Sequence, residues 1–118
     1  MTEPDLEPAR AAWRRLSEAC LIQRPDTAPG RMMSAEALTH GGKVFAFFTT
    51  KGGMVGLGLR LGRDFDMEGL GLTDWQHLAP FRTKPPMKDW IVVGLADVAR
   101  WDEMIALAYG QAQHKAKG

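Results

Sequence analysis

Apolar residues recur at helical spacing near the start of the chain. Five residues share a spacing of 3, 4, 3 and 4: Leu6, Ala9, Trp13, Leu16 and Cys20. Such a stripe is typical of an amphipathic helix that buries one face. Asp5 is expected to cap the start of this helix. Segment 24–30 contains two prolines and a glycine and is expected to form a loop after it.

A second stripe with the same spacing lies near the end of the chain. Its members are Val98, Trp101, Ile105, Ala108 and Ala112. Asp97 stands just before the stripe, where an N-cap residue is expected. Asp102 and Glu103 suit the first turn of a helix, because acidic side chains interact favourably with the helix dipole there. The pattern therefore predicts a second amphipathic helix.

Three strand candidates joined by glycine pairs lie between the helices. They are residues 31–39, 43–50 and 54–61, and the first has the weakest pattern. Gly41-Gly42 and Gly52-Gly53 separate them, and glycine supplies the positive φ that tight hairpins need. The pattern predicts an antiparallel meander.

Alternation along the second and third strands predicts which side chains share a face. In the second strand we expect Val44, Ala46 and Phe48 on one face and Phe45 and Phe47 on the other. Because both faces are apolar, this strand should be covered on both sides. In the third strand the large apolar residues that share a face are Val55, Leu57, Leu59 and Leu61. Gly56 and Gly58 leave its opposite face thin, which allows a helix, a partner or a ligand to approach the backbone closely.

The remaining pattern completes an α+β fold. It predicts a short helix over 63–68, a short edge strand over 75–80, an extended segment over 84–89 and a clear strand over 90–95. Strands grouped between terminal helices predict an antiparallel sheet covered by the N- and C-terminal helices. We expect one domain over 1–118, with flexible ends at 1–8 and 113–118.

Composition narrows the class of protein. Fifteen Lys and Arg residues against 14 Asp and Glu residues give a net charge of +1, which excludes a strongly basic histone-like type. The single cysteine, Cys20, excludes an internal disulfide and a thiolate zinc site, and we expect it to be a reduced, packed thiol. The acidic start lacks the apolar segment of a secretory signal, and no stretch is apolar enough to span a bilayer. We therefore expect a cytoplasmic protein with no membrane partner.

Residues able to carry catalysis do not fall into known catalytic patterns. The candidates tested are His40, His77, His114 and Cys20 for metal binding and Ser17 and Ser34 for nucleophilic attack. Their spacing matches neither a zinc site nor a nucleophile motif. The alternating carboxylates Asp64, Asp66 and Glu68 offer a divalent-cation site for an enzyme, but the solvated face of a short segment explains them better. We therefore expect no enzyme, no metal and no cofactor.

Basic residues gather in the predicted meander. Segment 31–63 contains five basic residues against one acid, Glu36, which is a local excess of +4. A second basic group, Arg82, Lys84 and Lys88, alternates with Phe81 and Trp90. Hairpins that bear Lys or Arg can straddle a phosphate backbone. Edge strands also carry such residues for solubility, so this reading has a competing structural explanation.

Three segments together resemble a known family. They are Gly30-Arg31-Met32-Met33, Gly41-Gly42-Lys43-Val44-Phe45-Ala46 and Pro86-Met87-Lys88-Asp89-Trp90-Ile91-Val92-Val93, the last followed by a helix that contains Trp101. Their order resembles the small bacterial MmcQ/YjbR-like proteins and the related TfoX N-terminal domains. The resemblance implies an antiparallel α+β domain similar to secretion-chaperone folds. It also implies a regulatory or DNA-binding role without a defined catalytic site.

Two functional hypotheses follow. In the first, the protein binds double-stranded DNA through non-specific phosphate contacts made by Lys43, Lys51, Arg60, Arg63, Lys84 and Lys88. In the alternative, an apolar groove on the thin face of the sheet binds a protein, a small ligand or a second copy of the chain as a homodimer. The residues expected at that groove are Met32, Met54, Gly56, Gly58, Met87 and Trp90.

Overall fold

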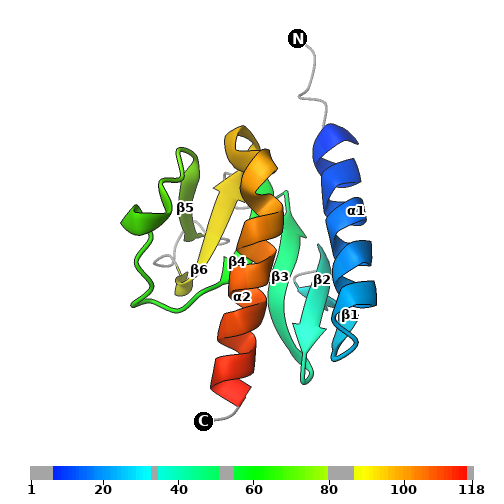
Figure 1. Ribbon diagram of the computed structural model, residues 1–118. Coiled ribbons are helices and arrows are strands. Elements are labelled where there is room, and N and C mark those ends of the chain that lie inside the picture. Colours follow the sequence, from blue (N-terminus) through cyan, green and yellow to red (C-terminus); the bar gives the residue numbers. More distant parts are fainter. Residues whose placement is uncertain (1–6, 33–34, 51–54, 80–86, 117–118) are drawn as a thin grey trace.

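A computed structural model describes residues 7–32, 35–50, 55–79 and 87–116, with side chains as far as Gln113. These residues form a six-stranded antiparallel sheet with a helix at each end of the chain (Figure 1). The elements are α1 Glu7–Gln23, β1 Thr27–Met32, β2 Ala35–His40, β3 Lys43–Thr49, β4 Gly56–Arg60, the 3-10 helix η1 Glu68–Leu70, β5 Trp75–Leu78, β6 Met87–Gly94, the 3-10 helix η2 Leu95–Arg100 and α2 Trp101–Ala116. The predicted α+β class is confirmed.

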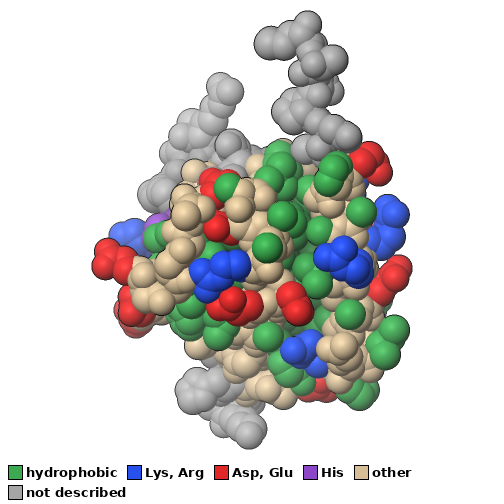
Figure 2. All heavy atoms as spheres, turned by 45° about the horizontal axis from the view of Figure 1, so that its top comes forward, with side chains coloured by type: hydrophobic (Ala, Val, Ile, Leu, Met, Phe, Trp, Pro, Cys, Tyr) green, Lys and Arg blue, Asp and Glu red, His purple; other side chains and the backbone are tan. Residues whose placement is uncertain are grey.

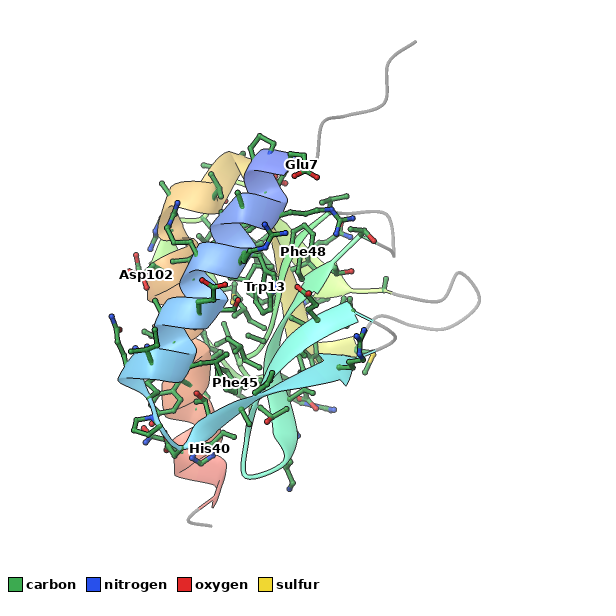
Figure 3. All side chains as sticks on the ribbon, turned by 90° about the vertical axis from the view of Figure 1, so that its right-hand side faces the viewer. Glu7, Trp13, His40, Phe45, Phe48 and Asp102 are labelled. Carbon is green, nitrogen blue, oxygen red and sulfur yellow. The ribbon has the colours of Figure 1, made fainter. Side chains whose placement is uncertain are left out.

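The strand order in the sheet is β1-β2-β3-β4-β6-β5. Every neighbouring pair is antiparallel, and β5 lies at an edge, as its short pattern predicts. Both α-helices lie on the same face of the sheet (Figure 3). Both helices extend into segments that were predicted to be flexible. Helix α1 starts at Glu7, inside 1–8, and α2 continues to Ala116, inside 113–118.

The sheet has one strand more at its start than the sequence predicts. The predicted loop 24–30 and the predicted strand 31–39 are instead a hairpin, in which Gly30 pairs with Ala37 and Arg31 with Glu36. The prediction of a loop rested in part on Pro29, because proline has no N–H to donate to the hydrogen-bond ladder of a sheet. It is tolerated here since β1 is an edge strand.

A β-bulge changes which side chains of β3 face the helices. Leu38 pairs with Ala46, but the next residue of β2, Thr39, pairs with Val44, so Phe45 is the extra residue. A slip of one residue reverses the faces of the residues beyond it. Phe45 therefore joins Ala46 and Phe48 in the helix-facing core, and Val44 packs on the opposite face with Phe47. The predicted grouping was wrong for Phe45 and Val44.

The main core lies between the helices and the sheet (Figure 3). Trp13 of α1 stacks on Phe48 of β3 with ring centroids 6.4 Å apart, and Phe48 also contacts Trp101 of α2 at 6.3 Å. Trp101 is fully buried, and its indole N–H donates to the carbonyl of Gly94. Each predicted apolar stripe thus contributes one tryptophan, Trp13 or Trp101, that packs against Phe48.

The opposite face of the sheet carries a second buried cluster. Its buried members are Ala37, Phe47, Leu78, Trp90 and Val92. The rings of Phe47 and Trp90 meet edge to face with centroids 5.5 Å apart. Both faces of β3 are therefore buried, as its two apolar faces predict.

Asp97 does not cap α2, because it lies inside η2 and α2 starts only at Trp101. The buried Asp97 carboxylate instead accepts hydrogen bonds from the Thr73 N–H at 3.0 Å, the Thr73 hydroxyl at 3.0 Å and the Asp74 N–H at 2.7 Å. It fixes the loop that leads into β5. Val98, which the stripe predicted to be buried, is exposed because it belongs to η2.

The segment after β4 also differs from the prediction. A helix over 63–68 does not form, and the only helical turn described there is η1, which ends at Gly71 with a left-handed φ of 66°. The Asp66 carboxylate accepts a hydrogen bond from the Gly69 N–H at 3.2 Å. Such local side-chain bonds favour turns over continued helix.

Candidate functional site

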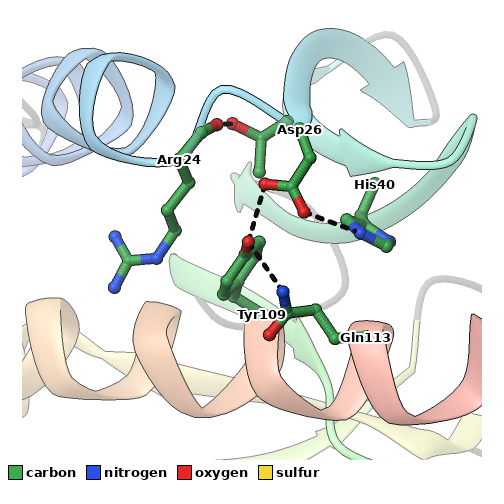
Figure 4. A network of polar contacts seen from close by, with 6 residues as sticks. Arg24, Asp26, His40, Tyr109 and Gln113 are labelled. Carbon is green, nitrogen blue, oxygen red and sulfur yellow. Dashed lines mark hydrogen bonds and ion pairs between the residues drawn. The ribbon is translucent and has the colours of Figure 1, made fainter.

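Three distant parts of the chain meet at a polar network (Figure 4). Asp26 lies between α1 and β1, His40 ends β2, and Tyr109 lies in α2. The Tyr109 hydroxyl donates to Asp26 Oδ1 at 2.6 Å, and His40 Nε2 lies 3.0 Å from Asp26 Oδ2. Gln113 Nε2 donates to the Tyr109 oxygen at 2.9 Å. The network joins the C-terminal half of α2 to the end of the β2 strand.

The network fixes the protonation of its acidic members. The hydrogen bond from Tyr109 holds the pKa of Asp26 below its usual range, and His40 adds to this effect. The same bond raises the pKa of Tyr109, because loss of its proton would place two negative charges together. At neutral pH the pair is therefore a carboxylate and a neutral phenol.

Ring contacts surround the Tyr109 side chain. The Arg24 guanidinium lies 5.1 Å from its ring centroid, which is a cation–π contact. His40 and Phe45 meet the ring edge-on at 5.8 Å and 5.9 Å. Phe45 reaches α2 because of the bulge in β3, so the bulge helps to build this part of the molecule.

A cavity of about 280 Å³ adjoins the network. It is lined by His40, Gly41, Lys43, Val44, Phe45, Arg60, Gln111 and Ala112. These residues come from the β2–β3 turn, the start of β3, the end of β4 and the C-terminal part of α2. Gly41 and Gly42 form the turn with φ values of 59° and 81°, as the glycine pair predicts. We refer to this feature as the turn cavity.

The turn cavity brings together two of the six predicted phosphate-binding residues, Lys43 and Arg60. Neither forms an ion pair with another residue that the structure describes. Lys88 is exposed on β6 and does not line the turn cavity. Lys51 and Lys84 lie outside the described residues.

Arg63 has a different position. Its Nε lies 3.3 Å from Asp89 Oδ1, and its backbone N–H donates to the same oxygen at 3.1 Å. This pair lines a neighbouring hollow of about 350 Å³, which shares Gln111 with the turn cavity. The positive charge of Arg63 is therefore balanced locally by Asp89.

The predicted groove on the thin face is filled in part by the chain itself. A side chain at Gly58 would lie 2.2 Å from the Phe47 ring, and one at Gly56 would meet the backbone of Val93. Trp90 is buried beside Phe47. Met32 is half-buried against the same cluster, Met87 is 39% exposed, and Met54 lies outside the described residues.

Charges on the helix-bearing face are mixed. Figure 2 shows Lys and Arg side chains there separated by acidic and apolar ones, so the described side chains on the face drawn form no continuous basic strip. One such mixed pair is Arg100 and Glu103, whose Nη2 and Oε2 lie 2.7 Å apart.

Other candidates for chemistry were the metal-ligand types and Cys20. Within the described ranges, no three His, Cys, Asp or Glu side chains are grouped as metal ligands would be. Cys20 is buried in the core, as its place on the helical stripe predicts. In the part of the chain that the structure covers, no helix combines the length and apolarity needed to cross a bilayer.

Sequence reasoning missed most of this site. His40 was taken for an isolated histidine, and Asp26, Tyr109 and Gln111 were not singled out. The hydrogen bond between Asp26 and Tyr109 joins residues 83 positions apart. A local residue pattern cannot predict a contact at such a separation. The available signal was the cluster His40-Gly41-Gly42-Lys43, in which a tight turn brings a histidine and a lysine together.

Comparisons with protein-family models, curated proteins and solved structures found no match for this chain. The likeness to the MmcQ/YjbR-like and TfoX N-terminal families therefore stays a prediction made from the motifs. A fold class does not define a function, which depends on the residues of the site.

Proposed function

We propose that this protein is a binding module that holds an anionic ligand in the turn cavity. The observation that carries the proposal is the charge of the cavity lining. Lys43 and Arg60 are cationic, and none of the described lining residues is acidic. An ammonium and a guanidinium at one cavity offer charge-assisted hydrogen bonds to a carboxylate or phosphate.

The nearest carboxylate of the network does not oppose this role. Asp26 already accepts from Tyr109 and His40, and it is absent from the described cavity lining. Because Asp26 accepts both of these hydrogen bonds and is not among the described lining residues, Lys43 and Arg60 remain available to a ligand. The network serves as a support that orders the cavity wall.

Binding fits this site better than catalysis. The described lining offers no hydroxyl, thiol or carboxylate, and its one imidazole, His40, is already engaged with Asp26 through Nε2. The Tyr109 hydroxyl, whose pKa is raised, stays protonated at neutral pH and is engaged with Asp26. A non-enzymatic, ligand-responsive role also agrees with the regulatory function that the family resemblance implies.

The test is a thermal-shift series with small anions, comparing wild type with Lys43→Gln and Arg60→Gln. A ligand that binds only the native state must raise Tm. We expect anions to raise the wild-type Tm and to have a much smaller effect in both variants. Arg15→Gln is the control, because it removes one cation from an exposed position on α1. Equal shifts in all four proteins would contradict the proposal.

Double-stranded DNA is the second candidate, supported by Lys43 and Arg60 at the end of the meander and by the exposed Lys88. Fluorescence anisotropy with a labelled random duplex, at low and near-physiological salt, tests it. Phosphate contacts predict binding that weakens steeply with salt, and a shallower slope for the triple variant that replaces Lys43, Arg60 and Lys88 with Gln. Lack of binding at low salt would discard the DNA hypothesis.

A further inference from the structure

We infer that the turn cavity selects a small organic carboxylate with one flat apolar ring, in preference to inorganic phosphate or a nucleotide. The inference rests on the proposed anion-binding function and adds the chemical class of the ligand. It follows from the two kinds of cavity wall, the cavity volume and the helix end beside the cavity.

The lining divides into a polar part and an apolar part. Lys43 and Arg60 supply positive charge, and the Gln111 amide supplies a further donor and acceptor. The apolar lining residues are Val44 and Ala112, which are half-buried, and Phe45, which is buried. An inorganic anion uses only the polar part and leaves the apolar wall in water. A ligand that joins a charged group to an apolar body uses both, and burial of its apolar surface adds to affinity.

The volume limits the size of the apolar body. The cavity holds about 280 Å³. Small-molecule sites commonly span about 300–1,000 Å³, so this cavity lies at the lower end. A dry apolar cavity of about 150 Å³ is large enough for benzene. One ring with a short charged substituent therefore fits within this volume.

The position of α2 favours a single negative charge. Gln111 and Ala112 belong to the C-terminal part of the helix, which ends at Ala116. The C-terminal end of a helix dipole carries partial negative charge. A phosphate dianion is opposed by this charge about twice as strongly as a carboxylate. Phosphate sites also commonly use backbone N–H groups at a helix N-terminus, and α2 presents its opposite end here.

The chemistry of the donors is compatible with a carboxylate. A guanidinium matches the two oxygens of a carboxylate with parallel N–H groups, and Arg60 lines the cavity. His40 Nε2 is engaged with Asp26, so Lys43 and Arg60 are the cationic donors that remain for a ligand.

The experiment is isothermal titration calorimetry of the full chain with three probes. The probes are benzoate, its neutral relative benzamide, and inorganic phosphate, each at up to about 10 mM, at which a millimolar site is mostly filled. We expect benzoate to bind and the other two to bind at least about tenfold more weakly, since each lacks either the charge or the apolar body.

Four variants locate the binding. Lys43→Gln and Arg60→Gln should each weaken benzoate binding about tenfold, through loss of a charge-assisted hydrogen bond. Ala112→Leu should weaken benzoate binding by filling the apolar part of the cavity. Ala106→Leu is its control, because Ala106 is exposed on the same helix and does not line the cavity.

The outcomes separate the two proposals. Phosphate binding equal to or tighter than benzoate binding, and lost in Arg60→Gln, would keep the anion-binding function and overturn the ligand class. Benzamide binding as tight as that of benzoate would overturn both, since charge would then play no part. Binding of none of the three probes would also overturn both. Benzoate binding unaffected by Lys43→Gln, Arg60→Gln and Ala112→Leu would place the site elsewhere and overturn the inference.

Discussion

The side chains of Asp26 and Tyr109 are joined by a 2.6 Å hydrogen bond, although 83 positions separate them in the sequence. The bond closes a loop that contains the whole sheet and more than half of α2. His40 and Gln113 attach to the same pair, so the bond anchors one side of the turn cavity. This relationship leads directly to a spectroscopic prediction.

Tyr109 is the only tyrosine of the chain, so its ionisation can be followed by ultraviolet absorbance of the phenolate. We expect its midpoint above the usual value near pH 10, because the Asp26 carboxylate raises the pKa of Tyr109. Asp26→Asn should return the midpoint toward that value. An identical titration curve in the two proteins would contradict the assigned cause.

The same pair predicts how stability depends on pH. The pKa of Asp26 is lowered on folding, so its contribution is present above the unfolded value near 4 and is lost as pH falls through the folded value. The pKa of Tyr109 is raised on folding, so its contribution is present below the unfolded value near 10 and is lost as pH rises through the folded value. The Tm difference between wild type and Tyr109→Phe should therefore be largest between these limits. A difference that grows below pH 4 would refute this linkage.

The bulge in β3 predicts unequal costs for two adjacent residues. Phe45 is 1% exposed in the helix-facing core, whereas Val44 is half-buried on the other face. Phe45→Ala should lower the free energy of unfolding by about 3–5 kcal/mol. Val44→Ala should cost clearly less. Urea denaturation measures both, and a larger cost at Val44 would indicate regular alternation instead of the bulge.

Two glycines predict changes of opposite sign. A methyl group at Gly58 would lie 2.2 Å from the Phe47 ring, so Gly58→Ala should destabilise the protein by about 1–3 kcal/mol through overpacking. Gly110 lies inside α2 with no atom near its missing side chain, so Gly110→Ala should stabilise by up to about 1 kcal/mol through helix propensity. Thermal unfolding of the two variants provides the comparison. A stabilising Gly58→Ala would show that the space above β4 is open.

The buried Asp97 predicts a clear effect on stability. Asp97→Ala removes the acceptor for three donors of Thr73 and Asp74, which should cost about 1–3 kcal/mol through loss of three partly buried hydrogen bonds. Asp102→Ala changes an exposed position in the first turn of α2. It should lower the free energy of unfolding by only about a few tenths of a kcal/mol. Hydrogen exchange at the amides of Thr73 and Asp74 should accelerate in the first variant alone. Unchanged exchange there would rule out the role given to Asp97.

The local residue pattern was sufficient to predict a helix or strand wherever one face of that element packs against one core. The stripes containing Trp13 and Trp101 predicted both helices, and the apolar run of β3 predicted a strand buried on both sides. Period and burial are linked along a single element, so these features can be read from consecutive residues. The same holds for the turn at Gly41 and Gly42.

Pattern failed where a single residue breaks the period or a proline is tolerated by its surroundings. The bulge at Phe45 depends on how β2 and β3 pair, and Pro29 fits a strand only because β1 lies at the sheet edge. Asp97 stands where a helix cap is expected from the sequence, but the N–H groups that donate to it belong to residues 23 and 24 positions away. Each outcome depends on a neighbouring element that the local sequence does not specify.

The sequence by itself determined the class of fold, the two helices, most of the strands and the cationic residues Lys43 and Arg60. Only the tertiary structure decided that these two line one cavity, that Arg63 is balanced by Asp89, and that Asp26, His40 and Tyr109 meet. The physical reason is that hydrophobic periodicity acts within one element, whereas a binding site is made from side chains that separate elements bring together.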